Sequence, residues 1–407
     1  MVRSMTRHSL RAALMMAVMA CATTRALAQD IRIKVDIPRD IARTIERQID
    51  EIVRNVSRHD FGRDLQEMIR SGLAGLDALD QIGDHIGGTI HARISRDDQN
   101  RNLKAEEVAR ETKTLQLGAN GSLDLRNIAG DITVTAGTGR DTIVEIEKKS
   151  RGETAAEAKA ALDKVTVDVT QRGEHATVQT QYPGQRNDRN DRNNRNDSSN
   201  VSVSYRVTAP AGLALVIGST AGQVTVKDMR GDLSINVVAG DINVTNAGRI
   251  RVIKSMAGQV RVTGVDSDGT VELGSISGNV IAVQVKARRL VAGVTTGEVS
   301  VRDSSCDSAE LTSTMGSIEY QGSLAKNGRY ELRSHFGAVR FQPTSGAGYD
   351  LDASTFSGEI RADSTVSMQG ASLAPRMTPR KSIHTTVGDG SAVVVLRTFS
   401  GSVTIGK

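Results

Sequence analysis

Residues 240–262 read GDINVTNAGRIRVIKSMAGQVRV, in which the five-residue unit Gly240-Asp-Ile-Asn-Val244 returns as Gly258-Gln-Val-Arg-Val262. In both copies a glycine is followed by a polar residue, a branched aliphatic, a second polar residue and a second aliphatic. This alternation is typical of a short, half-buried strand. A half-unit, Gly248-Arg-Ile-Arg-Val252, lies between the two copies. One period therefore holds two or three short strands and tight turns.

The unit recurs through the C-terminal half of the chain, mostly at intervals of 18 to 21 residues. Such self-similarity is typical of a solenoid, in which each strand pairs with equivalents about 4.8 Å above and below it. We predict a mainly β fold, namely a β-solenoid (β-helix or β-roll) with 18–21 residues per rung, preceded by a smaller α-helical region. The candidate site residues are its structural turns: Gly130, Gly222, Gly240, Gly258, Gly278, Gly297, Gly316, Gly337, Gly358 and Gly401.

Upstream of the repeats the apolar period changes along the chain. A period of two predicts strands from Thr112 onward, interrupted by a helix-like piece over residues 154–162. Before Thr112, one alternating strand and two amphipathic stripes, over residues 41–56 and 65–90, predict the helical region. The predicted organisation is a signal peptide (1–28), a strand plus helical region (29–111), a first β part (112–183), a disordered Asn/Asp/Arg insertion (184–200) and the solenoid repeats (201–407).

The N-terminus has the features of a secretory signal. A basic segment and a short apolar run precede Ala26-Leu27-Ala28, a small-x-small cleavage site, so we expect export and a mature chain that begins at Gln29. Cys21 stands in a loose lipobox and is the alternative, less favoured site of lipid attachment. No later apolar run reaches the length of a transmembrane helix. After cleavage before Gln29, Cys306 is the single cysteine, which excludes an internal disulfide.

Composition narrows the class of protein further. The 407 residues are 38% hydrophobic but only 2% aromatic, with no tryptophan, so a core of small aliphatic side chains is expected. Seven of the ten aromatic residues lie between Tyr320 and Phe399, which predicts wider final rungs. Most of the net charge of +5 comes from four arginines within residues 1–28. The rest of the chain is nearly neutral, which gives no argument for nucleic-acid binding.

The chain resembles a bacterial envelope family of β-strand repeats often labelled "putative adhesin" and otherwise a domain of unknown function. The resemblance covers about Thr112 to Lys407. It rests on Gly130-Asp-Ile-Thr-Val134, on Val203-Ser-Tyr-Arg-Val207 followed by Pro210, and on the serial glycine units. It implies an exported β-solenoid with adhesion or envelope association and no established chemistry.

The sequence contains no clear catalytic or metal-binding motif. The residues after the repeat glycines never place carboxylates on two consecutive units, which favours solvated turns over calcium or acid/base sites. His85 and His91 are six apart and would not share a helix face. Cys306 is interpreted as a turn residue rather than a nucleophile. We therefore predict no enzyme activity, no metal and no cofactor, and a sugar site would have to rest on Tyr330, Tyr349 or Phe336.

The sequence favours a non-enzymatic envelope scaffold or adhesion-type binding module, periplasmic or associated with the cell surface. Its expected partners are an envelope protein or a surface glycan. Two alternatives remain open. One is a polysaccharide-acting enzyme, which predicts a cluster of carboxylates with Arg or Lys in a groove spanning adjacent rungs, and the other is an envelope-stress sensor or regulator acting through residues 41–90. The chain ends two residues after the strand at Ile405, so self-association through a C-terminal solenoid edge is a further hypothesis.

Overall fold

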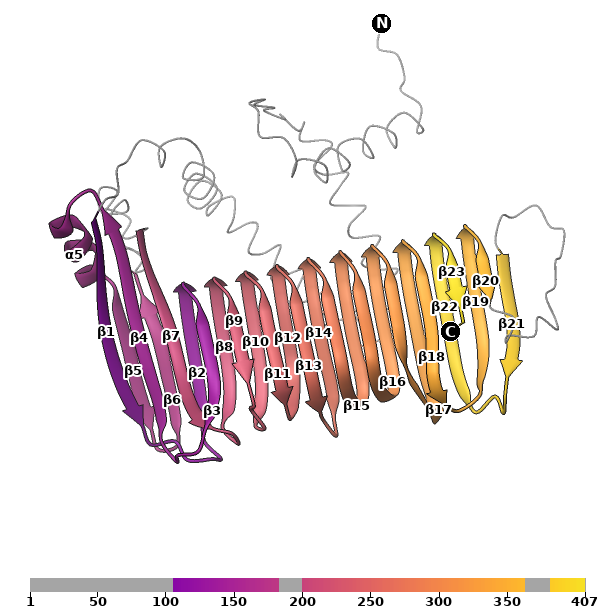
Figure 1. Ribbon diagram of the computed structural model, residues 1–407, viewed down its shortest axis with the longest axis horizontal. Helices are drawn as coiled ribbons and strands as arrows, with labels where there is room; N and C mark the ends of the chain where they lie inside the picture. The colour runs from indigo at the N-terminus through magenta and orange to yellow at the C-terminus, as the bar shows by residue number, and fades with distance from the viewer. Residues whose placement is uncertain (1–104, 183–199, 363–380, 407) are drawn as a thin grey trace, which may run out of the picture. The chain divides into compact units, whose positions relative to one another are not determined.

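The computed structural model describes residues 105–182, 200–362 and 381–406, all within a unit that spans Arg101–Lys407. This unit is built almost entirely of strands, with one helix among the described residues (Figure 1). The predicted mainly β solenoid is therefore confirmed. The predicted signal peptide with Cys21, residues 29–104 of the predicted strand plus helical region and nearly all of the 184–200 insertion lie outside the described residues. Residues 105–111, predicted to belong to the helical region, are part of a strand that spans Ala105–Leu115, so the β part begins before Thr112.

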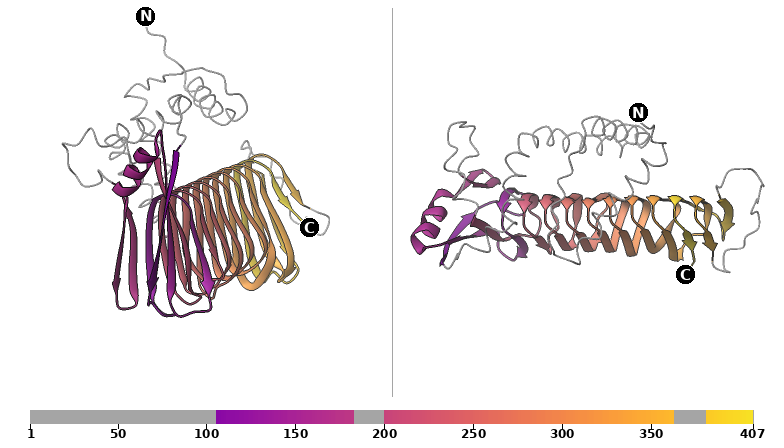
Figure 2. Two further views of the ribbon diagram at one scale, coloured as in Figure 1. Left: turned by 60° about the vertical axis from the view of Figure 1, so that its left-hand side comes forward. Right: turned by 90° about the horizontal axis from the view of Figure 1, so that it is seen from above.

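A typical rung contains two strands that lie in two layers, called here the first sheet and the second sheet (Figure 2). For example, β10 (Asp232–Ala239) lies in the first sheet, Gly240 forms the corner, and β11 (Ile242–Ala247) continues in the second sheet. Successive rungs pair in parallel, so Leu233 faces Leu215 of the preceding rung in the ladder. Two strands per rung is the smaller of the two numbers that the repeat length allowed.

The two sheets run the length of the column. The first sheet has the order β5 (Thr166–Arg172), β6 (His175–Gln181), β2 (Ser122–Ala129), β8 (Ala214–Ala221), β10, β12 (Arg249–Ala257), β14 (Thr270–Ser277), β15 (Val280–Thr296), β16 (Val299–Met315), β17 (Ile318–Phe336), β22 (Ala392–Ser400), β19 (Tyr349–Ser357), β21 (Lys381–Val387). The second has the order β1 (Ala105–Leu115), β4 (Thr142–Gly152), β7 (Val201–Pro210), β3 (Ile132–Gly137), β9 (Val224–Lys227), β11, β13 (Val260–Asp266), β15, β16, β17, β18 (Val339–Gly346), β23 (Val403–Ile405), β20 (Ile360–Ala362). Because β15, β16 and β17 bend through both sheets, all the strands are joined into one hydrogen-bonded sheet.

The core lies between the two sheets. Leu233 and Ile235 of β10 and Ile242 and Val244 of β11 are at most 1% exposed, and aliphatic side chains fill the equivalent positions on most rungs. Burial of each such side chain stabilises the fold by roughly 1.5–3 kcal/mol. Val and Ile suit this place because their stiff side chains lose little entropy on stacking.

Aromatic residues enter the core at the C-terminal rungs. The buried rings there follow one another in the spatial order Tyr330, Tyr320, Phe341 and Tyr349, and the centroids of neighbouring rings lie 5.5–5.7 Å apart. The other three aromatic residues of this region, Phe336, Phe356 and Phe399, lie on the outer surface. Four of the seven aromatic residues in this segment therefore pack in the core, and three lie on the surface.

The corner of the column is a ladder of close backbone contacts. A Cβ on Gly240 would overlap the carbonyl oxygen of Gly222 on the rung before it. Beneath the corner, Ser255 Oγ donates to the Gly240 carbonyl (3.0 Å) and Ser275 Oγ donates to the Gly258 carbonyl (2.9 Å). These side chains thereby give the corner carbonyl oxygens hydrogen-bond donors. The predicted turn glycines all stand at this corner: Gly130, Gly222, Gly240, Gly258, Gly278, Gly297, Gly316, Gly337, Gly401 and Gly358, in spatial order.

Antiparallel strands and a helix close the N-terminal end of the column. In the second sheet β7, β4 and β1 pair antiparallel, and in the first sheet β5 pairs antiparallel with β6. The helix α5 (Ala155–Lys164) corresponds to the helix-like piece of the sequence, and its N-cap Thr154 accepts a hydrogen bond from the Glu157 amide (3.2 Å). Its apolar side, including Leu162, is buried. A solenoid needs such a cap because the last rung otherwise exposes its core.

At the C-terminal end the order of rungs differs from the order of the sequence. The final rung, β22 with β23, lies between the rung of β17 and β18 and the rung of β19 and β20. Since Ile405 pairs with Phe341 on one side and with Ala362 on the other, it has ladder partners on both sides. The hypothesis of self-association through the last strand is wrong in its location, because β20 and β21 are the outermost described strands.

Candidate functional site

An outward-facing row of side chains runs along the first sheet, two positions before each corner glycine. At the C-terminal rungs this row consists of His335 on β17, Phe399 on β22 and Phe356 on β19. The His335 and Phe399 ring centroids are 5.0 Å apart with planes 7° from parallel, and those of Phe399 and Phe356 are 4.8 Å apart with planes 3° from parallel. The spacing of neighbouring strands, about 4.8 Å, sets this stacking.

A fourth ring completes the cluster. Phe336 meets His335 edge to face at 4.6 Å and Phe399 at 6.1 Å. Phe336, Phe356 and Phe399 each remain 41–43% exposed although they pack on one another. We call these four residues, His335, Phe336, Phe356 and Phe399, the aromatic ridge. Nearer the N-terminal end the same row holds aliphatic side chains, methionine or threonine, and Val238 and Met256 are its large exposed apolar members.

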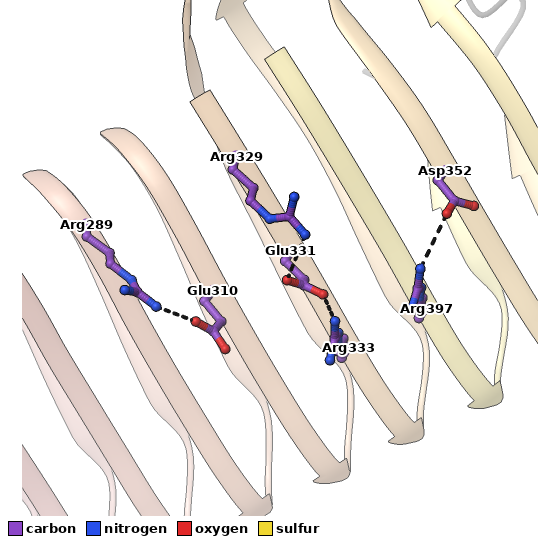
Figure 3. A network of polar contacts seen from close by, with 7 residues as sticks. All are labelled: Arg289, Glu310, Arg329, Glu331, Arg333, Asp352 and Arg397. Carbon is purple, nitrogen blue, oxygen red and sulfur yellow. Dashed lines mark hydrogen bonds and ion pairs between the residues drawn. The ribbon is translucent and has the colours of Figure 1, made fainter. Parts of the chain in front are cut away.

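A charged network, drawn in Figure 3, lies on the same outer face, since Arg333 and Arg397 precede His335 and Phe399 by two residues on their strands. Arg289 Nη2 lies 2.7 Å from Glu310 Oε2, and Arg397 Nη2 lies 3.5 Å from Asp352 Oδ2. Glu331 is shared by Arg333 and, at 3.6 Å, by Arg329. We use the name charged network for these seven residues: Arg289, Glu310, Arg329, Glu331, Arg333, Asp352 and Arg397.

Two features of the charged network stand out. Arg333 and Arg397 are partners in the register of β17 and β22, so two like charges lie side by side. Partial burial, together with the positive charge of Arg397, lowers the pKa of Arg333. Glu310 and Glu331 are likewise register partners on β16 and β17. The outer face therefore holds a mixed cluster of carboxylates and bases across adjacent rungs, which is one part of what the polysaccharide-enzyme alternative predicts.

The polar residues after the corner glycines connect successive rungs. Asp131 Oδ1 accepts from the Gln223 amide (2.9 Å), Asp241 Oδ1 from the Gln259 amide (2.7 Å), and Asn279 Oδ1 from the Glu298 amide (2.9 Å). These side chains are exposed, as solvated turns would be, but they also satisfy backbone donors of the next rung. Their role in the described structure is to hold the corner in register.

One serine–histidine pair lies near the N-terminal end. Ser122 Oγ is 2.6 Å from His175 Nδ1, and β2 and β6 place the two residues opposite each other. A serine nucleophile also needs an orienting group on the histidine and donors for an oxyanion. Within the described residues, no carboxylate hydrogen-bonds to the His175 ring. The pair thus supplies two of the required groups and joins two neighbouring strands.

Cys306 lies inside strand β16 and not in a turn, which corrects the sequence interpretation. It is 2% exposed and stands in register between Ala287 and Leu324. Burial raises the pKa of its thiol to about 12. The reactive form of a cysteine is the thiolate, so this environment suppresses reactivity.

We expect Cys306 to resist thiol reagents until the column opens. In a Cys21→Ser background at pH 8, a disulfide-exchange reagent should label the native chain negligibly and the urea-unfolded chain at one thiol. The reason is the combination of burial and the raised pKa. Rapid labelling of the native chain would contradict the position of Cys306 in the core.

The aromatic residues proposed for sugar binding fall into two groups. Tyr330 is buried, where its Oη donates to the Cys306 carbonyl (2.6 Å) and accepts from the Ala325 amide (2.8 Å). Tyr349 is buried as well, so neither tyrosine offers a ring face on which a sugar site could rest. Phe336 alone is exposed. Sequence reasoning missed Phe356 and Phe399, although both precede a repeat glycine by two residues, as His335 does.

No group of three or more His, Cys, Asp or Glu side chains in the described ranges is arranged to hold a metal ion. Among the same residues, no helix has both the length and the apolar character required to span a membrane.

Comparison with known families places the chain. Residues 120–406 match the family described as Toastrack DUF4097, and the chain belongs to this family of β-repeat proteins. The resemblance noted from the repeats is thus confirmed. No curated protein matches the sequence.

Two solved structures are similar at low identity. A putative cell adhesion protein from Clostridium sporogenes ATCC 15579 is 13% identical, with a TM-score of 0.22, over 74% of this chain and 99% of that chain. A putative adhesin from Bacteroides fragilis NCTC 9343 is 12% identical, with a TM-score of 0.34, over 73% of this chain and 97% of that chain. At these TM-scores neither structure bears on the function of this chain.

Proposed function

We propose that this chain is a non-enzymatic scaffold or adhesion-type binding module of the cell envelope. It is exported through the signal peptide at residues 1–28 and works in the periplasm or at the cell surface. The aromatic ridge is the observation that carries this proposal. The chain has only five phenylalanines, yet three of them lie together on the surface. Contiguous exposed apolar side chains are typical of interaction sites, and aromatic residues are frequent in the centre of such sites.

The corner acids, Cys306 and the Ser122–His175 pair each have a structural role in the fold. This favours a binding role over a catalytic one. The corner acids accept hydrogen bonds from backbone amides of the next rung, and Cys306 is in the core. Ser122 is hydrogen-bonded to His175 on the neighbouring strand. The partner is an envelope protein or a surface glycan, and the binding site is the outer face of the first sheet around the ridge.

A polysaccharide-acting enzyme is the second candidate, and one observation favours it. Glu310 and Glu331 lie opposite each other on neighbouring strands with Arg289, Arg329 and Arg333 beside them. Carboxylate pairs perform acid/base work in glycoside cleavage. In this structure both carboxylates are engaged by arginines, and the Glu331 side chain is only 11% exposed. A polysaccharide whose depolymerisation is lost in Glu331→Gln would favour the enzyme.

The binding proposal is tested with the mature chain from Gln29 and an envelope extract. The triple variant Phe336→Ala/Phe356→Ala/Phe399→Ala should lower the affinity by about tenfold or more, because buried aromatic contacts dominate interfaces. It should fold normally, since all three rings are partly exposed.

The matched control is Val238→Ala/Met256→Ala, two exposed residues of the same row, 45% and 41% exposed, away from the ridge. This variant should bind as the wild type does. Equal binding by the folded triple variant would refute the assignment of the binding site to the ridge.

A further inference from the structure

Resting on the proposed function, we propose that the aromatic ridge and the arginine pair Arg333 and Arg397 form a docking surface for a protein segment that carries acidic side chains next to apolar ones. Exposed rings alone do not specify the chemistry of a partner. The arginine pair beside them does.

The backbone places each arginine beside a ring. Arg333 precedes His335 by two residues on β17, and Arg397 precedes Phe399 by two residues on β22. Residues two apart in a strand point to the same face. Because Arg333 and Arg397 are register partners and the two rings are stacked, the guanidinium groups form one row and the rings the adjacent row.

The arginine row retains positive charge. Arg397 has one carboxylate partner, Asp352 at 3.5 Å, and both side chains are 46% exposed, so solvent weakens this pair. Arg333 shares its partner Glu331 with Arg329. Of the seven residues of the charged network, four are arginines and three are carboxylates, so the arginines outnumber their partners within it. A carboxylate placed between Arg333 and Arg397 would accept charge-assisted hydrogen bonds and reduce the repulsion between them.

The central ring of the ridge presents its edge rather than its faces. Phe399 is stacked between His335 and Phe356, so its two faces are covered and its 43% exposure comes mainly from its edge. Ring edges carry the positive part of the aromatic quadrupole, which favours acceptors and anions. Sugars usually stack on open ring faces. The centre of the ridge thus suits apolar side chains with neighbouring carboxylates better than it suits a stacked sugar ring.

The test is an affinity selection on the folded mature chain with a displayed library of random peptides. Wild-type protein should enrich peptides that combine Asp or Glu with apolar residues. Arg333→Gln/Arg397→Gln should lose the acidic enrichment, and a consensus peptide measured by calorimetry should bind this variant about tenfold or more weakly. Arg289→Gln, in the charged network but on β15, should keep both properties.

Other outcomes overturn the inference. Acidic enrichment that survives in the double variant would show that the arginine pair does not read the carboxylates. Selection of peptides without acidic residues, or tighter binding of polygalacturonate than of the consensus peptide, would exclude the proposed partner class. If the triple phenylalanine variant loses envelope binding while the double arginine variant keeps it, the proposed function stands and this inference fails. If neither variant changes envelope binding, both fail.

Discussion

Replacing Gly316 by alanine is expected to unfold the rungs around it, with a loss of about 4 kcal/mol or more. Gly316 has φ of +148°, a conformation that side chains rarely adopt, and a Cβ there would overlap the carbonyl oxygen of Gly297. Neither group can move away, because the Gly316 amide donates to the Phe336 carbonyl (2.8 Å) and the Gly297 amide donates to the Met315 carbonyl (2.9 Å). Urea denaturation and hydrogen exchange measure the effect.

Gly218→Ala provides the matched control. Gly218 lies within β8, and the nearest atom to an added Cβ is Arg126 Cγ at 4.0 Å, an ordinary contact. This variant should be as stable as the wild type or slightly more stable, because alanine restricts the unfolded chain. Equal stability of Gly316→Ala and Gly218→Ala would show that the close backbone contacts at the corner do not require glycine there.

Replacing Leu396 by asparagine is expected to loosen both neighbouring rungs, with a cost of about 3 to 5 kcal/mol from the lost burial and an unpaired amide. Leu396 on β22 is fully buried between Leu332 of β17 and Ala353 of β19. Hydrogen exchange should therefore increase in β17 and β19 while β8 and β10 stay protected, because a rung contacts only its neighbours.

The control for Leu396→Asn is Val393→Asn on the same strand, where the side chain is 41% exposed. It should leave the exchange of β17 and β19 unchanged. If Leu396→Asn increased exchange in β17 and left β19 unchanged, β22 would be a terminal strand, and the insertion of the final rung between its neighbours would be wrong.

The sequence predicts the column because its information is local. The glycine units with their alternating aliphatics, such as Gly240 to Val244, specify a strand and a corner without reference to distant residues. The helix at Ala155–Lys164 follows from Thr154 and the composition after it. Corner hydrogen bonds such as that of Asp241 could have been suspected from an acid or amide after the glycine, since a solenoid repeats this position on each rung.

The candidate site is less accessible to sequence reasoning. His335, Phe356 and Phe399 hold the same place before a glycine, but nothing in the spacing states that residue 399 lies between the other two. The burial of Tyr330 and Tyr349 and the exposure of Phe336 depend on which side of its strand each residue occupies. A shift of one residue reverses that side, and bulges such as those in β16 and β17 shift the register.

The amino-acid order alone determined that this protein stacks short aliphatic strands through glycine corners, because each rung encodes its own alternation and turn. Only the tertiary structure decided which rung stacks on which. β17, β19 and β22 have similar apolar patterns, so the choice among them depends on the register and packing of the whole column. That choice brings Phe399 between His335 and Phe356 and places Arg397 beside Arg333, and so it creates the surface on which the proposed function rests.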